Sequence, residues 1–123
     1  MKFMLFAVAL LAGACGGVAA TPATLSLTTP LAEMSDAQSH YQRGLGFLES
    51  GELDQAVADF ARALELNPQI PGAYLNRAWA YTLLGRDREA RADIEMAVEL
   101  GVDPDLAQMI VMQGKQLREF TEN

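Results

Sequence analysis

The stretch YLNRAWAYTLLG, residues 74–85, decides the fold. Its apolar residues recur at helical spacing and a glycine closes it, which predicts a short helix with a left-handed stop. Shifted back by 34 residues, it falls on HYQRGLGFLESG, residues 40–51, a second segment of the same kind. A fixed period of this length predicts a repeat protein built from pairs of helices. Identical residues recur at this spacing as Arg43/Arg77, Gly51/Gly85, Ala56/Ala90, Ala58/Ala92, Asp59/Asp93, Ala63/Ala97, Glu65/Glu99 and Leu66/Leu100.

Glycines and prolines set the limits of five expected helices, over residues 35–50, 53–66, 71–84, 87–100 and 105–120. Asp87 can cap the fourth helix, and Asp103 followed by Pro104 opens the fifth. The fifth helix must cover the exposed side of the second repeat. It carries an apolar side made of Leu106, Met109, Ile110, Met112 and Leu117.

Composition limits the partners that this chain can take. The chain has 123 residues, room for one small domain, and a formal charge of −7. An acidic chain is a poor candidate for nucleic acid, because phosphate contacts need clustered lysine and arginine. A single cysteine, Cys15, excludes an internal disulfide, so packing must hold the domain together.

Residues 1–20 are typical of a secretory signal peptide. Lys2 is their only charge, and the apolar run over residues 3–12 is followed by small residues. An uncleaved membrane anchor is the alternative, but a bilayer needs roughly 20 apolar residues. Residues 21–34 contain Pro22 and Pro30 and are rich in small and polar residues, so we expect a flexible linker. We therefore expect an exported protein.

Cys15 follows Leu-Ala-Gly-Ala, which resembles a bacterial lipobox, where a peptidase cuts before a cysteine that then carries lipid. Ala12 stands where a larger aliphatic residue is usual. Ordinary cleavage after Ala14 or after Ala20 is the alternative. The resemblance implies lipidation of Cys15 and a place in the bacterial cell envelope, with the membrane reached through this N-terminal anchor alone.

The repeated residues resemble the tetratricopeptide repeat. This resemblance implies an all-α helix-turn-helix solenoid over residues 35–120, with repeats at about 37–70 and 71–104 and a capping helix at 105–120. His40 and Val102 depart from the family pattern, at positions where an aromatic residue and a proline are usual. The first repeat supplies His40, Gly44, Phe47, Gly51, Ala56, Phe60, Ala63 and Pro68, and the second supplies Tyr74, Ala78, Tyr81, Gly85, Ala90, Ile94 and Ala97.

In this family the first helices of the repeats line a concave groove that binds partner peptides. Trp79 is the best single candidate for such contact, because tryptophan is enriched among binding hot spots. The alternative is packing between adjacent repeats, or a dimer contact. The resemblance implies a partner-binding groove made of Tyr41, Leu45, Leu48, Glu49, Leu75, Trp79 and Leu83.

Charged residues recur at equivalent places in the two repeats. Arg43 and Arg77 lie on the first helices, and Asp59 and Asp93 lie on the second helices. We expect two structural pairs, Arg43–Asp59 and Arg77–Asp93, that each tie the two helices of one repeat together. Capture of an anion by the two arginines is the alternative.

The residues needed for catalysis or metal binding do not group in the sequence. His40 is the only histidine, and neither a Ser/His/Asp set nor metal-ligand spacing is present. We expect no enzyme activity, no cofactor and no metal. The predicted function is that of an adaptor which binds a peptide or helix of a protein partner. The alternative is a structural subunit or homodimer whose apolar first-helix face is permanently buried.

Overall fold

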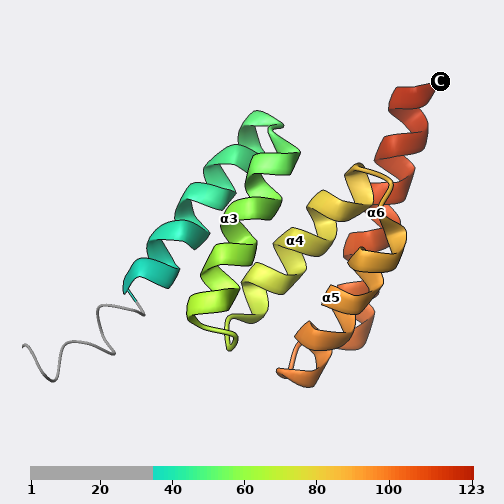
Figure 1. Cartoon of the computed structure of the whole chain (residues 1–123). Helices are drawn as coiled ribbons and strands as arrows, with labels where there is room; N and C mark the ends of the chain where they lie inside the picture. The colour runs from blue at the N-terminus through green and yellow to red at the C-terminus, as the bar shows by residue number, and fades with distance from the viewer. Residues whose placement is uncertain (1–34) are drawn as a thin grey trace, which may run out of the picture. The chain divides into compact units, whose positions relative to one another are not determined.

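The computed structural model describes residues 35–123, which form five helices and no strand. Residues 35–50 are helical and are followed by α3 (Leu53–Leu66), α4 (Pro71–Leu83), α5 (Asp87–Glu99) and α6 (Pro104–Glu122) (Figure 1). This confirms the predicted all-α helix-turn-helix solenoid. The signal peptide predicted for 1–20 and the linker predicted for 21–34 lie outside the described residues.

The helix ends follow the glycine and proline pattern, with one correction. Gly51, Gly85 and Gly101 have φ of 82°, 79° and 103°, the left-handed conformation that glycine adopts without a Cβ penalty. Asp103 caps α6, because its side chain accepts hydrogen bonds from two backbone nitrogens. The prediction that Asp87 caps the fourth helix is wrong. Asp87 is the first helical residue of α5, and no side chain caps that helix.

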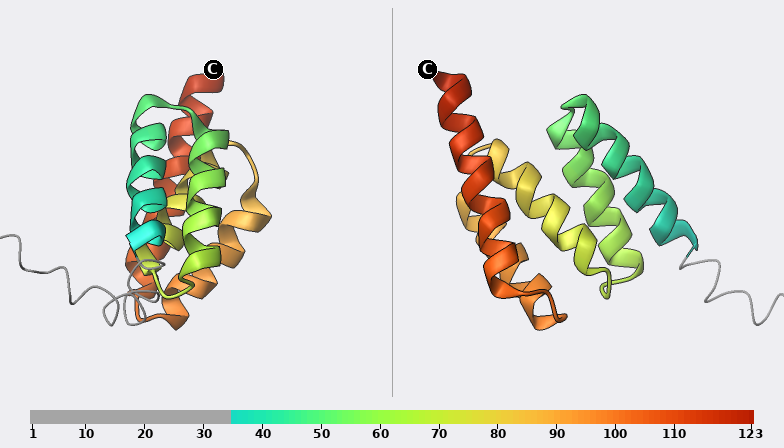
Figure 2. Two further views of the ribbon diagram at one scale, coloured as in Figure 1. Left: turned by 60° about the vertical axis from the view of Figure 1, so that its left-hand side comes forward. Right: turned by 180° about the vertical axis from the view of Figure 1, so that it is seen from behind.

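Each helix packs against its neighbours in the array. α3 lies against the helix over 35–50, where Phe60 meets Gly44, and it also contacts α4. α4 contacts α5 and α6, and α5 contacts α6. Figure 2 shows α6 at one end of this array, beside α4 and α5. A solenoid of this kind is stabilised by contacts between adjacent repeats. Among residues 35–123, no helix lies beyond α6 in the array.

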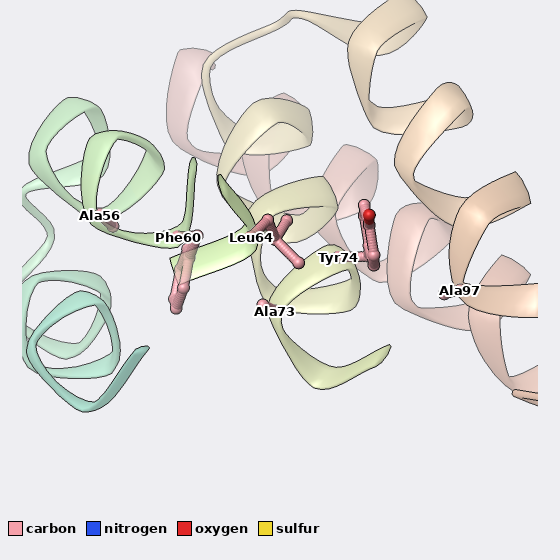
Figure 3. Close-up of a cluster of buried hydrophobic side chains, with 6 residues drawn as sticks. All are labelled: Ala56, Phe60, Leu64, Ala73, Tyr74 and Ala97. Atoms are coloured by element: carbon pink, nitrogen blue, oxygen red, sulfur yellow. The ribbon is translucent and has the colours of Figure 1, made fainter. Parts of the chain in front are cut away.

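Two buried clusters form the core. The first joins α3, α4 and α5 through Phe60, Leu64 and Tyr74, together with small alanines (Figure 3). Phe60 is completely buried beside Gly44, where an added Cβ would lie 2.8 Å from the ring. A small residue is therefore required at Gly44, where the two helices of the first repeat cross. The second cluster consists of Ala78, Ala90, Ile94 and Ala107.

The end helix α6 packs through small residues rather than through its long apolar side. Ala107 and Gly114 are its buried residues. An added Cβ on Gly114 would lie 2.8 Å from Cγ2 of Thr82 on α4, so the two helix backbones approach closely. The apolar side that was expected to cover the second repeat is instead largely exposed, at Leu106, Met109, Met112 and Leu117.

Candidate functional site

A shallow groove lies between α4 and α6, beside Trp79. Its volume is about 450 Å³. Trp79 reaches it from α4, and Cε3 of its ring would lie 3.5 Å from a Cβ built on Gly114. The absence of a side chain at Gly114 thus allows α6 to pack beside the indole ring. We call this feature the Trp79 groove, and its lining is Trp79, Gln113, Gln116, Leu117 and Phe120.

The other predicted groove residues on the first helices mostly pack within the chain. Tyr41, Leu45, Leu48 and Leu75 are half-buried and pack against the first core cluster. The hydroxyl of Tyr41 accepts a hydrogen bond of 3.1 Å from Nδ2 of Asn76 in the next repeat. This arrangement is the packing between adjacent repeats that the sequence left open as the alternative.

Leu83 and Glu49 complete the predicted set. Leu83 is half-buried at the end of α4, and Glu49 is exposed near the end of the helix over 35–50. Neither residue lines the Trp79 groove. Of the seven residues predicted to form a partner-binding groove, the structure therefore places Trp79 in the groove that it forms with α6.

Four lining residues of the groove lie on α6 and were missed by the reasoning from the sequence. Leu117 was placed on the apolar side of this helix, whereas Gln113, Gln116 and Phe120 were given no role. In the structure these polar and apolar residues line one groove together. The signal that could have found them is the seven-residue spacing of Ala107 and Gly114, which marks the side of α6 that lies against α4.

Both predicted charge pairs are present, each with two hydrogen bonds. Arg43 donates from Nε and Nη2 to Asp59, at 2.7 and 2.6 Å. Arg77 donates to Asp93 in the same way, at 2.8 and 2.6 Å. Each pair joins the two helices of one repeat. Neither pair lies in the Trp79 groove.

The surroundings of the two pairs differ. The side chain of Arg77 is 19% exposed and its guanidinium lies 5.8 Å from the ring centre of Tyr74 and 5.7 Å from that of Tyr81, whereas Arg43 is 62% exposed. The hydrogen bond with Asp93 raises the pKa of Arg77. Arginines held in this way by a carboxylate are already occupied, which favours the structural role over anion capture.

His40 belongs to the network of the first repeat. Its Nδ1 lies 3.3 Å from Oδ1 of Asp59. The hydrogen bond from Arg43 lowers the pKa of Asp59, and His40 acts in the same direction while burial opposes both. Asp59 is nearly buried, so these two partners keep its carboxylate charged inside the repeat.

A third cluster holds α6 to the rest of the array. Nη1 of Arg118 donates to the backbone oxygen of Thr82 at 2.6 Å and to Oδ1 of Asp87 at 3.0 Å. Lys115 lies 3.9 Å from the same carboxylate. The hydrogen bond from Arg118 lowers the pKa of Asp87. Both cations of α6 are thus directed to α5 and away from the exposed side of the helix.

The rest of the described surface offers little specific chemistry. Within residues 35–123, no three His, Cys, Asp or Glu side chains gather as ligands of one metal ion would. A bilayer-spanning helix is also absent from this part of the chain. Cys15, the predicted lipidation site, lies outside it. A second depression of about 200 Å³ opens between α5 and α6, and its lining is Asp87, Arg91, Ile94, Glu95, Gln108, Val111 and Lys115.

Family models agree with the repeat structure. Two models of the tetratricopeptide repeat match, one over residues 37–70 and the other over residues 60–92. The first match coincides with the first predicted repeat. The second begins within α3 and ends within α5, so it spans the junction between the two repeats. No solved structure matches the chain.

Several curated proteins share this part of the sequence. Tetratricopeptide repeat protein 36 of Caenorhabditis elegans is 39% identical over 59 residues, 48% of this chain and 33% of the relative. Its namesake in Danio rerio is 37% identical over 78 residues, 62% of this chain and 42% of the relative. Hsp70-Hsp90 organizing protein 3 of Arabidopsis thaliana is 36% identical over 64 residues, 52% of this chain and 12% of the relative. The chain thus spans less than half the length of each of these three relatives.

Proposed function

We propose that this chain, an all-α solenoid of tetratricopeptide repeats, is an adaptor that binds an apolar segment of a protein partner in the Trp79 groove. The observation that carries the proposal is the position of Trp79, half-buried on α4 with one side in an open groove. Tryptophan supplies a large rigid contact area at low entropic cost, and it is common among the residues that dominate binding energy.

The lining of the groove favours a peptide or helix as the ligand. Leu117 and Phe120 offer apolar contact, and Phe120 is 81% exposed. Gln113 and Gln116 each carry both a hydrogen-bond donor and an acceptor, so they can bond to the backbone of a bound segment. The groove lining contains no charged residue. An apolar segment therefore fits better than a charged terminus.

The relatives support the class of function. One of them is named as an organizing protein for Hsp70 and Hsp90, and others are named for the repeat itself. Such names support a module that holds other proteins. The partner of this chain is therefore a protein or peptide. The groove indicates one property of that partner, which is that its bound segment is apolar.

Export and lipid anchoring are further parts of the proposal. They rest on the apolar segment 3–12 and on the lipobox-like residues before Cys15. Mass spectrometry of the mature protein tests them, because a lipidated protein begins at a modified Cys15. An unmodified protein that begins at Thr21 would contradict lipidation while leaving export intact.

The adaptor proposal is tested by photo-crosslinking in cells with a benzoylphenylalanine at Trp79. A matched probe at Ala58, which is exposed on α3 and distant in sequence from the groove residues, is the control. We expect a discrete product with another protein from Trp79 and none from Ala58. The proposal is refuted if neither position gives a product, or if both give the same products.

The alternative function, a homodimer that buries the first-helix face, finds less support. Tyr41, Leu45 and Leu75 already pack inside the chain, so that face leaves little apolar surface for a second copy. The large apolar residues that are exposed in residues 35–123 lie mainly on α6. A contact between copies is therefore better sought on the end helix.

A further inference from the structure

Few buried side chains hold the end helix α6 to the array. Its buried residues are Ala107 and Gly114, and Val111 is half-buried beside the second core cluster. Small residues remove little apolar surface from water, so this contact is weakly stabilised. The large apolar side chains of the helix are 46–81% exposed, at Leu106, Met109, Met112, Leu117 and Phe120. A segment held in this way opens at a lower free energy than the core of its domain.

The two repeats have a core that does not depend on α6. The buried residues of the first cluster come from α3, α4 and α5. In the second cluster, Ala107 is the one buried residue among positions 35–123 that comes from α6. Departure of α6 would therefore leave the first cluster intact and uncover one side of the second. The repeats can stay folded when α6 separates from them.

The connection between α5 and α6 allows α6 to move as one unit. Gly101 has a φ of 103°, and a Cβ built on it would meet no atom within 4 Å. The backbone can therefore rotate there without a clash. The cap of the helix lies after this point, because Asp103 accepts hydrogen bonds from the backbone nitrogens of Asp105 and Leu106. The helix thus carries its own N-terminal cap with it when it moves.

Arg118 supplies the polar contact that opposes this movement. Its Nη1 donates to the backbone oxygen of Thr82 and to Oδ1 of Asp87, at 2.6 and 3.0 Å, and its side chain is 21% exposed. The oxygen of Thr82 is one of the last carbonyls of α4, which lack a partner inside that helix. A cation at this end of a helix is also favoured by the helix dipole. Arg118 therefore joins α6 to the end of α4 and to the start of α5.

We propose that Arg118 is the positioning residue of the Trp79 groove, because it keeps α6 in place as one wall of that groove. Four of the five lining residues lie on α6, although Arg118 itself is not among them. The groove is therefore complete only while α6 is docked on α4 and α5. When the contacts of Arg118 break, α6 undocks and both repeats stay folded.

This proposal deepens the adaptor function and rests on it for what the groove binds, whereas the docking of α6 does not depend on a partner. A ligand that requires the docked state binds with an apparent Kd equal to the intrinsic Kd divided by the docked fraction. Loss of Arg118 therefore weakens partner binding in proportion to the docked fraction that is lost. By the same linkage, the bound partner keeps α6 docked.

Hydrogen exchange of the full chain, followed by mass spectrometry, tests the separate opening of α6. Most of the stability of a helix in a protein comes from its packing, so undocked α6 loses its backbone hydrogen bonds and its amides exchange. We expect residues 108–118 to exchange faster than the cores of α3 and α4. In Arg118→Met we expect exchange in α6 to rise at least about tenfold, because a charge-assisted contact is lost, with α3 unchanged.

The matched control is Arg62→Met, which removes another arginine from an ion pair. Arg62 pairs with Glu65 of its own helix α3 at 3.0 Å, so its loss breaks no contact between helices, and we expect α6 to exchange as in the native chain. Arg118→Lys keeps the positive charge and is expected to restore at least about a third of the lost protection. Asp87→Asn removes the carboxylate and leaves Arg118 in place, so it provides a second test if Arg118→Met fails to fold.

Proteolysis gives a second readout that belongs to α6 alone. Lys115 is the only lysine of residues 35–123, so a protease that cuts after lysine reports the opening of this helix. We expect Arg118→Met to be cut after Lys115 at least about tenfold faster than the native chain. Phe60→Leu is the control for global unfolding, because it leaves a space in the first cluster and does not touch α6. We expect it to lower the midpoint of urea unfolding and to leave the cleavage rate unchanged.

Three results would overturn the proposal. The first is exchange of native α6 as slow as that of α3 and α4. The second is cleavage after Lys115 that Phe60→Leu accelerates as much as Arg118→Met, since α6 would then open only by global unfolding. The third is an Arg118→Lys chain that exchanges as fast as Arg118→Met. Loss of the crosslinked product at Trp79 alone would refute the adaptor function and leave these exchange results in force.

Discussion

Substitution of Gly114 by alanine tests how α6 is held. The added Cβ would lie 2.8 Å from Cγ2 and 3.2 Å from Cβ of Thr82. Thr82 cannot easily move away, because it is completely buried and its hydroxyl donates a hydrogen bond of 2.8 Å to the backbone of Ala78. The backbones of α4 and α6 must therefore separate to admit one methyl group.

The size of the effect follows from two opposing terms. Alanine in place of glycine in a helix interior gains about 1 kcal/mol of intrinsic helix stability. Forcing an extra carbon into a packed contact costs about 1–3 kcal/mol. We expect Gly114→Ala to lower the free energy of unfolding by about 1 kcal/mol. Gly46→Ala is the matched control, because no atom lies within 4 Å of its added Cβ, and we expect it to raise that free energy by about 1 kcal/mol.

Urea unfolding followed by circular dichroism measures both variants. The expected difference of about 2 kcal/mol between them corresponds to about 8–16 °C in melting temperature for a domain of this size. If Gly114→Ala proves as stable as Gly46→Ala, the close approach of α6 to α4 does not exist and the Trp79 groove loses its second wall.

Three further predictions concern the charge pairs and the exposed end of α6. Arg77→Met should cost about 3 kcal/mol of unfolding free energy because it leaves the buried Asp93 unpaired. The double variant Arg77→Met/Asp93→Leu should recover most of that loss. A loss for Arg77→Met no larger than that at a surface site would contradict the role of the pair. The pKa of Asp59 is lower in the folded chain than its ordinary value of 3.8. Its contribution to the free energy of unfolding is therefore full above pH 3.8 and is lost as the pH falls through the folded pKa. Acid unfolding of Asp59→Asn should therefore depend less on pH below about 4 than that of the native chain, and equal slopes would count against the pair. Phe120→Ser should leave the unfolding free energy of the monomer within about 0.5 kcal/mol of the native value in urea titrations, because the side chain is 81% exposed; a larger loss would mean that Phe120 packs.

The fold could be predicted because the same pattern of helices and glycines occurs twice in the sequence. The 34-residue spacing placed the helices and the glycines between them, and the equal separation of Arg43–Asp59 and Arg77–Asp93 identified both pairs. These features are local or occur in both repeats, so the pattern in one repeat supports the prediction made from the other. The structure differs mainly at the helix that has no copy, α6.

The side of α6 that faces the array could not be predicted from hydropathy. Its long apolar residues suggested an inward side, yet the contact is made by Ala107 and Gly114. Close backbone approach, which small residues permit, decided the orientation instead. Likewise, Tyr41 and Leu45 lie on a broad apolar side of the first helix. Hydropathy alone could not separate packing against the next repeat from exposure in a groove, and the structure places both residues in the packing.

The measurement that tests the central claim most directly is the affinity of the crosslinked partner for the native chain, for Trp79→Ala and for Met96→Ala. Met96 is an exposed apolar residue on α5 that does not line the Trp79 groove, so it controls for loss of surface hydrophobicity. Circular dichroism confirms that the variants are folded. We expect Trp79→Ala to raise Kd at least about 30-fold, the loss typical of a binding hot spot, and Met96→Ala to leave it unchanged. Equal affinities of Trp79→Ala and the native chain would show that the partner binds elsewhere.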